Sequence, residues 1–182
     1  LLAHAVLSNE RAQDSRPALL GAYAVAALGV LAKGLIGFVL PALVIGIWLL
    51  AQGRWRTVGR LVSMPGILLF LALTVPWFAT MHWHYPEFLH YFFIVQHFER
   101  FATTGFNNVQ PFWFYGAVLT LFTLPGLPWL VRHARLTYLL EPQKGPIRQL
   151  MWVWLLAIAV FFSLPQSKTL GYILPAVPPL ML

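Results

Sequence analysis

The chain has 182 residues, of which 59% are hydrophobic, 15% are aromatic and only 9% are charged. Soluble domains usually carry about 25% charged residues, so this chain has too few polar side chains to cover a soluble fold. Its net charge of +7 does not indicate nucleic acid, because the basic residues are sparse and stand between apolar segments. The absence of cysteine excludes disulfides, thiolate metal sites and a cysteine nucleophile.

Apolar segments dominate the chain from residue 18 onward. Because a helix needs roughly 20 apolar residues to cross a membrane, they predict about six spans, at residues 18–31, 35–50, 61–80, 112–131, 150–164 and 170–182. The first two are separate spans, since one helix over 18–50 would be about 50 Å long. We expect an all-α polytopic membrane protein in which residues 1–182 form a single partial transmembrane domain. The sequence starts without Met and ends within an apolar segment, so we expect an internal part of a longer protein.

Basic residues indicate how the spans are oriented. Nine of the twelve fall in three of the polar breaks, at residues 8–17, 51–60 and 132–149. The other three breaks hold one basic residue each, Lys33, Arg100 and Lys168. By the positive-inside rule, the first set of breaks is cytoplasmic and the second set lies on the outer side.

Residues 81–111 form the longest of the outer breaks. At about 100° per residue, Glu87, His90, His97 and Arg100 share one broad helical face, and aromatic residues cover most of the rest. We therefore predict a helix lying in the outer interface with its polar face toward a site. Five flanking aromatic residues suit an interfacial belt, Trp77, Trp83, Tyr85, Trp113 and Tyr115.

Prolines are frequent within the predicted spans, among them Pro65, Pro76, Pro125, Pro128, Pro175, Pro178 and Pro179. Proline removes a backbone donor and kinks a helix. Membrane proteins tolerate such breaks where neighbouring helices or a cavity satisfy the exposed carbonyls. The pattern therefore favours a bundle of helices with an internal cavity over a single anchor.

Three cations on the outer side, Lys33, Arg100 and Lys168, are exceptions to the positive-inside rule, so their position needs an explanation. One reason is an anionic ligand at that side, such as a polyprenyl phosphate or a lipid A phosphate. The other is that each side chain extends to the lipid headgroups without binding anything specific.

Histidines and acids on the outer side give two further candidates. His82 and His84 form an H-x-H pair that could bind a divalent metal, and interfacial hydrogen bonding is the alternative. Glu87 and Glu99 are the only acids predicted there, and neither suits the role of catalytic base.

Three segments carry a resemblance to a known family. Residues 31–41 contain Lys33-Gly34 and then Pro41, similar to the L-x-K-G motif of bacterial relatives of the protein O-mannosyltransferases. Residues 75–115 resemble the outer loop of the lipid A aminoarabinose transferases, and residues 161–175 resemble their S-K-x-x-x-Y-I-L-P motif. Together the segments resemble the GT-C membrane glycosyltransferases of this superfamily over nearly the whole chain from residue 25.

The resemblance implies a GT-C helix bundle in the bacterial inner membrane, with its site facing the periplasm. Such enzymes move a sugar from a polyprenyl-phosphate carrier to lipid A, another glycan or a protein. Carried over, Lys33, Arg100, Lys168 and Tyr172 would line the phosphate region, and His97 would lie near it. The family's catalytic Asp belongs to a first outer loop that this sequence lacks, so we expect the chain to be inactive alone.

The sequence departs from the family pattern at two places. Gln96 stands where the family often has Glu, and Lys168 is followed by Thr169-Leu170-Gly171 where Lys-Leu-Pro is common. The alternative function is a transporter or flippase of lipid-linked glycans, which would also need cations and broken helices. It should carry charges near the membrane midplane and inverted repeats, and neither is visible.

Overall fold

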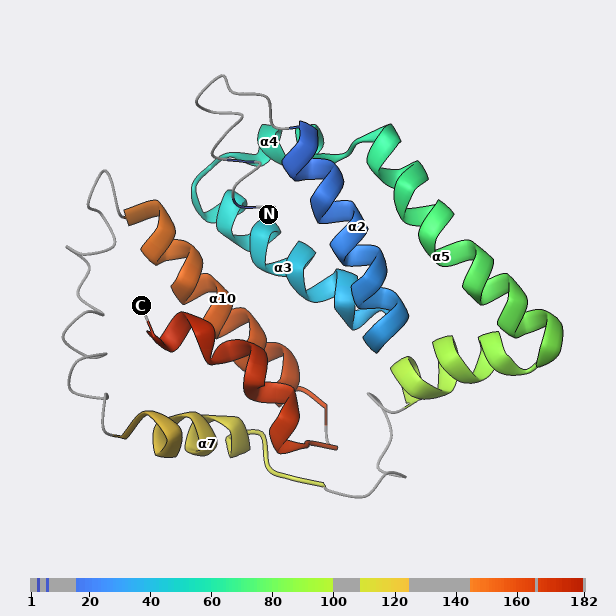
Figure 1. The fold of residues 1–182 in the computed structure, drawn as a ribbon. Coiled ribbons are helices and arrows are strands. Elements are labelled where there is room, and N and C mark those ends of the chain that lie inside the picture. The colour runs from blue at the N-terminus through green and yellow to red at the C-terminus, as the bar shows by residue number, and fades with distance from the viewer. Residues whose placement is uncertain are drawn as a thin grey trace. The chain divides into compact units, whose positions relative to one another are not determined.

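The computed structural model describes residues 3, 6, 16–99, 109–124, 145–165 and 167–181. The chain forms two compact units, Leu1–Ile94 and Val95–Leu182. The described elements are helices, coloured from blue to red along the chain in Figure 1. The first unit contains α2 (Arg16–Lys33), α3 (Ile36–Ala51), α4 (Trp55–Leu61) and α5 (Met64–His84), and it ends within η1 (His90–Glu99).

A two-residue turn joins α2 to α3, where the sequence predicted a break between two spans. Gly34 adopts a left-handed conformation (φ 77°), and its N–H donates to the Val30 carbonyl at 2.8 Å. Glycine adopts this conformation without the strain that a β-carbon would bring. The chain therefore reverses direction, and α3 runs back beside α2 (Figure 1).

Glycines allow the helices of the first unit to approach closely. A β-carbon on Gly37 of α3 would lie 2.8 Å from Cα of Gly29 in α2, and closer still to the Gly29 carbonyl. Small residues serve this purpose at helix crossings in membranes. Gly66, near the start of α5, lies against the ring of Tyr23 in the same way.

Tyr23 also joins α2 to the segment between α4 and α5. Its hydroxyl donates to the Leu61 carbonyl at 3.0 Å and accepts from the Ser63 N–H at 3.3 Å. The Ser63 side chain in turn accepts from the Gly66 N–H, as an N-cap of α5. These bonds satisfy backbone groups at a helix start that apolar neighbours could not satisfy.

An aromatic cluster connects the end of α5 to the start of η1. Phe78 lies 5.3 Å from Phe92 and 5.5 Å from Phe93 between ring centroids, and Phe88 stacks on Phe92. The predicted outer-loop helix is present here as a wide π-type helix, and Glu87 lies in the turn before it. Of the four residues predicted to share one helical face, Arg100 and the side chain of His97 lie outside the described residues.

The second unit contains α7 (Phe114–Thr123), α10 (Gly145–Ser163) and two 3-10 helices, η3 (Leu170–Ala176) and η4 (Pro178–Met181). Helix α10 packs against α7, η3 and η4. The predicted span at residues 170–182 is therefore replaced by short tight turns. Pro175, Pro178 and Pro179 explain the difference, because proline cannot donate the bonds of a continuous α-helix.

Three of the described helices, α2, α5 and α10, are long and apolar enough to cross a membrane. Helix α3 has 16 residues and α7 has 10, and both are apolar. Helix α5 extends to His84, so the predicted outer loop begins at residue 85 instead of 81. The chain is thus an all-helical, multi-pass membrane protein.

Candidate functional site

A corner between the end of α10 and the start of η3 holds two of the predicted site residues. Helix α10 ends at Ser163, and the backbone of Ser167 pairs with Val109 in an isolated antiparallel bridge. This pairing brings the segment before α7 beside the segment after α10. We call the residues around it the Lys168 corner, namely Gln110, Tyr115, Phe162, Pro165, Ser167, Lys168, Thr169 and Tyr172.

Lys168 is buried in this corner, with 4% of its surface exposed. Its Nζ donates to the carbonyl oxygens of Pro165 at 2.6 Å and Gln110 at 2.9 Å. An ammonium group has three N–H donors, so one remains for a ligand. No carboxylate of the described residues forms an ion pair with Lys168.

The electrostatics of the Lys168 corner favour an anion. Burial lowers the pKa of Lys168 from its ordinary value of 10.5, because desolvation disfavours the charged form. A buried charge without a partner is costly, and an opposite charge offsets that cost. The corner can therefore hold a phosphate oxygen at a fixed position with a charge-assisted hydrogen bond.

Tyr115 fixes the backbone next to Lys168. It is fully buried, and its hydroxyl donates to the Thr169 carbonyl at 2.8 Å while accepting from the Thr169 N–H at 3.1 Å. The prediction of an interfacial belt was therefore wrong for Tyr115, whereas Trp83 is 86% exposed. The role of Tyr115 depends on a contact with a residue 54 positions away in sequence, and the residues near Tyr115 in the sequence do not indicate that contact.

Tyr172 presents a second polar group from the first turn of η3. Its ring stacks on Phe162 of α10, with the centroids 5.4 Å apart and the planes 25° apart. Its hydroxyl makes no hydrogen bond with the described residues. A phenol oriented by stacking, four residues after Lys168 in the chain, can donate a hydrogen bond to a ligand.

Lys33 lies in the first unit, in the last turn of α2, and is exposed. It forms no hydrogen bond or ion pair with any residue that the structure describes. A cation at a helix C-terminus is favoured by the helix dipole. The helix dipole therefore explains the position of Lys33 without a ligand.

Two further predicted residues fall at the edge of the described part of the chain. Arg100 lies outside the described residues. The backbone of His97 belongs to η1, and its side chain lies outside the description. Of the predicted phosphate residues, the structure thus describes Lys168 and Tyr172 at the start of η3, and it adds Tyr115 as a support for the backbone of Thr169 between them.

His82 and His84 lie in the last turn of α5 and are exposed. The Nδ1 atom of His84 is 2.9 Å from the Thr80 carbonyl oxygen, which suits a donor N–H at that position. A bound metal usually needs at least three protein ligands. Within the described ranges, no group of three histidine or acidic residues could hold a metal ion.

The fold and the Lys168 corner define a multi-pass, all-helical membrane protein with a buried cation suited to an anionic ligand. No protein-family model matches the chain. Curated relatives are named undecaprenyl phosphate-alpha-4-amino-4-deoxy-L-arabinose arabinosyl transferases. That of Proteus mirabilis is 38% identical over 155 residues, covering 85% of this chain and 27% of the relative. That of Pectobacterium atrosepticum is 30% identical over 183 residues, covering 100% of this chain and 33% of the relative.

Solved structures agree with these relatives. The crystal structure of ArnT from Cupriavidus metallidurans bound to undecaprenyl phosphate matches 91% of this chain with a TM-score of 0.76 at 30% identity. The match covers 29% of that protein, and its apo form gives a TM-score of 0.72. The chain therefore belongs to the GT-C membrane glycosyltransferases of the protein O-mannosyltransferase and lipid A aminoarabinose transferase superfamily. It spans about a third or less of the length of these relatives.

Proposed function

We propose that the protein containing this chain is a glycosyltransferase that uses a polyprenyl-phosphate sugar. It moves the sugar, a 4-amino-4-deoxy-arabinose or a similar one, from undecaprenyl phosphate to lipid A. The alternative acceptors are another glycan or a protein. In this reaction the chain supplies part of the site that holds the carrier phosphate.

The observation that carries this proposal is the buried Lys168, whose two backbone acceptors leave one N–H for a ligand. The similarity to a structure bound to undecaprenyl phosphate supplies the class of anion. A transporter or flippase has no comparable support, because the relatives in this comparison are named as transferases.

In the proposed reaction the acceptor attacks the anomeric carbon of the sugar, and the bond from that carbon to the phosphate oxygen breaks. The leaving phosphate gains negative charge as the bond breaks. Lys168 and the Tyr172 hydroxyl stabilise this charge, and the contribution of Lys168 is strong because its side chain is buried. The proton of the acceptor goes to a base outside this chain.

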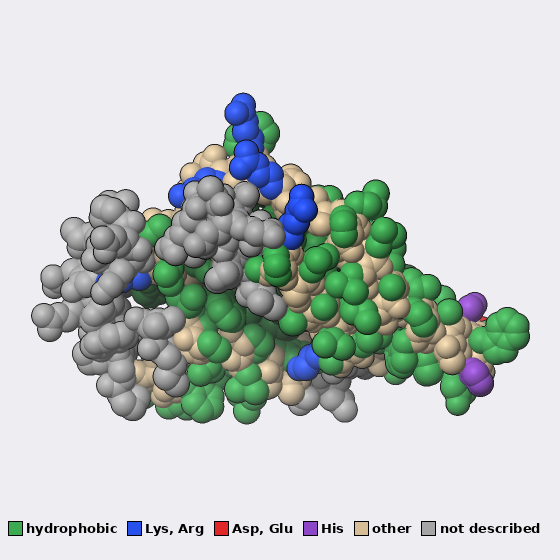
Figure 2. Space-filling view, turned by 45° about the horizontal axis from the view of Figure 1, so that its top comes forward, with side chains coloured by type: hydrophobic (Ala, Val, Ile, Leu, Met, Phe, Trp, Pro, Cys, Tyr) green, Lys and Arg blue, Asp and Glu red, His purple; other side chains and the backbone are tan. Residues whose placement is uncertain are grey.

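The distribution of charge supports a site on the periplasmic side of a bacterial inner membrane. In the first unit, Arg16, Arg54, Arg56 and Arg60 belong to the end of the helices opposite Lys33. Figure 2 shows basic side chains gathered at that end. In the second unit, Arg148 lies near the start of α10, and Lys168 follows its end. The positive-inside rule then assigns the arginine ends to the cytoplasm and both lysines to the outer side.

Replacing Lys168 in the full-length protein tests the proposal. We expect Lys168→Gln to lower kcat/KM for transfer to lipid A by about 100-fold or more, since one donor to a developing oxyanion contributes on this scale. Lys168→Arg should retain more transfer because it keeps the charge. Arg148→Gln on the opposite side is the matched control. Near-normal transfer by a Lys168→Gln protein with an unchanged thermal unfolding midpoint would refute the phosphate role.

A further inference from the structure

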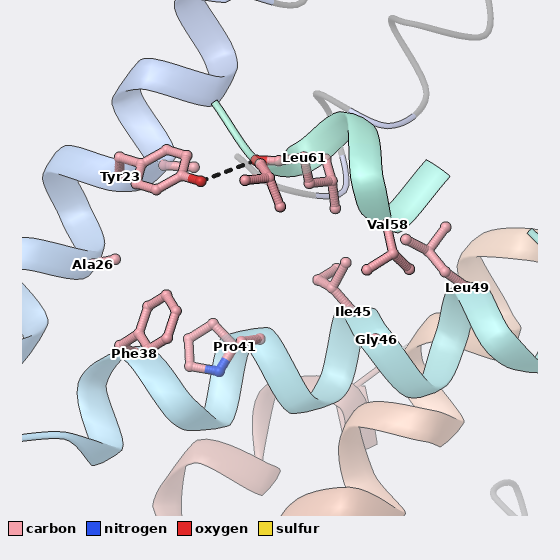
Figure 3. A pocket seen from close by; sticks show the side chains of 12 residues that line it. Tyr23, Ala26, Phe38, Pro41, Ile45, Gly46, Leu49, Val58 and Leu61 are labelled. Atoms are coloured by element: carbon pink, nitrogen blue, oxygen red, sulfur yellow. Dashed lines mark hydrogen bonds between the residues drawn. The ribbon is translucent and has the colours of Figure 1, made fainter. Parts of the chain in front are cut away.

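An apolar cavity of about 280 Å³ lies in the first unit between α2, α3 and α4 (Figure 3). Aliphatic and aromatic side chains line it, among them Phe38, Ile45, Leu49, Val58 and Leu61. Its one hydroxyl, on Tyr23, donates to the Leu61 carbonyl. The cavity therefore offers almost no hydrogen bonds to water, and it suits an alkyl group instead.

Helix α4 lies over one end of this cavity. One of its faces lines the cavity, and another carries arginines. Val58 and Leu61 line the cavity, as Figure 3 shows. Arg56 and Arg60 are four residues apart, so they share another face of the helix and are exposed. The guanidinium of Arg56 lies over the ring of Trp55, 5.2 Å from its centroid, which restricts its orientation.

The surroundings of α4 suit a membrane surface. Trp55, Val62 and Met64 are more than 60% exposed, so apolar side chains accompany the arginines. No Asp or Glu occurs among the described residues at this end, whereas Arg54, Arg56 and Arg60 follow each other closely. Such a basic cluster next to membrane-spanning helices attracts anionic headgroups.

We propose that this end of the first unit binds one anionic phospholipid of the adjacent leaflet. One acyl chain occupies the cavity between α2, α3 and α4, and the phosphate binds Arg56 and Arg60 at the interface. The apolar lining suits an acyl chain, whereas the headgroup finds its charged partners on the exposed side of α4. The proposal needs the membrane orientation argued above, but not the transfer of a sugar.

This site is distinct from the Lys168 corner in chemistry as well as in place. The Lys168 corner has one buried cation fixed by backbone carbonyls. Helix α4 carries exposed arginines above an apolar cavity. A lipid bound there would hold α4 against α2 and α3 by joining the cavity to the headgroup layer.

Photo-crosslinking of the full-length protein in vesicles tests the inference. The probes are phosphatidylglycerol and phosphatidylcholine, each with a diazirine in one acyl chain, at equal density. We expect phosphatidylglycerol to label peptides from residues 38–62 and to exceed phosphatidylcholine at least tenfold. Arg56→Gln with Arg60→Gln should lower the labelling about 25-fold, since each arginine near an anionic surface contributes about fivefold in affinity. Arg56→Lys with Arg60→Lys should stay within about fivefold of the wild type.

A second variant tests the cavity separately from the charge. A β-carbon on Gly46 meets no atom within 4 Å, so Gly46→Leu can fill the cavity without a backbone clash. It should lower labelling about tenfold or more. Gly116→Leu is the matched control, because Gly116 of α7 also has open space and does not line the cavity.

Equal labelling by the two lipids, or labelling that Gly46→Leu leaves unchanged, would overturn the inference. Absence of any label in residues 38–62 would also overturn it and would indicate that another part of the full-length protein fills the cavity. Transfer measured on the same samples separates the two proposals. Lipid labelling in a protein without transferase activity rejects the proposed function alone, and transfer without labelling rejects this site alone.

Discussion

Two turns of the molecule present a lysine by different means. At the turn after α2, Lys33 is exposed, and the geometry comes from backbone contacts between glycines. In the Lys168 corner, the lysine is buried, and carbonyls and Tyr115 hold its surroundings. A lysine that opposes the orientation rule can therefore be an exposed charge or a fixed donor. Only the fixed one defines where a phosphate oxygen would lie.

The largest expected effect is a loss of stability at the close contact between α2 and α3, next to the first turn. Gly37→Ala should destabilise the protein by about 3 kcal/mol, the upper part of the range for overpacking, because its β-carbon meets the backbone of Gly29. Backbone atoms cannot move aside by changing a rotamer. The measurement is thermal unfolding in detergent, and Gly46→Ala on the same helix is the control, with open space around it. Equal stability of the two variants would mean that α2 and α3 are not held by this close approach.

The second prediction distinguishes the structural role of Tyr115 from the ligand-binding role of Tyr172 in the Lys168 corner. Tyr115→Phe should cost about 2 kcal/mol of stability, because it leaves the Thr169 N–H without its partner and removes one of the two donors to the Thr169 carbonyl, the other being the Tyr172 N–H. Tyr172→Phe should leave stability within about 0.5 kcal/mol, since the Tyr172 hydroxyl has no partner among the described residues. It should instead weaken binding of undecaprenyl phosphate. Thermal unfolding and a binding titration on both variants measure this, and a reversed pattern would contradict the two roles.

Sequence patterns were sufficient for the class of protein and for the ends of the helices near Lys33 and Lys168. Hydropathy is a local property of the sequence, so it predicts apolar helices without knowledge of how they pack. Tyr115 was missed because its partner lies 54 residues away in sequence. The continuous span predicted at residues 170–182 was wrong over the described residues 170–181, because three prolines outweighed hydropathy there.

The third prediction concerns the pH dependence of the fixed lysine. Burial lowers the pKa of Lys168, so the folded protein loses this proton at a lower pH than the unfolded chain. Above the lowered pKa, affinity for undecaprenyl phosphate should fall by up to about tenfold per pH unit, because the anion binds the charged form of Lys168. Between the lowered pKa and 10.5, the stability of the protein without ligand should rise with pH, because the unfolded state binds more protons there.

Lys168→Arg is the control for this window, since arginine stays protonated throughout. Both slopes should be weaker in the variant, and the difference between the two proteins isolates Lys168 from other groups that titrate at high pH. Binding titrations and thermal unfolding at several pH values provide the measurement. Parallel slopes in the two proteins would show that the charge on Lys168 does not contribute to anion affinity.

The smallest effect is expected at Lys33. Lys33→Gln should cost about 0.5 kcal/mol of stability through the lost interaction with the C-terminal dipole of α2. Because this side chain is exposed, its contribution to anion affinity is screened, and the loss should be about two- to fivefold at low salt and vanish near 1 M salt. The loss for Lys168→Gln should persist at high salt, because buried charges are screened much less. A salt-resistant loss at Lys33 as large as that at Lys168 would mean that Lys33 contacts the phosphate directly, and the contrast between the two turns would then be wrong.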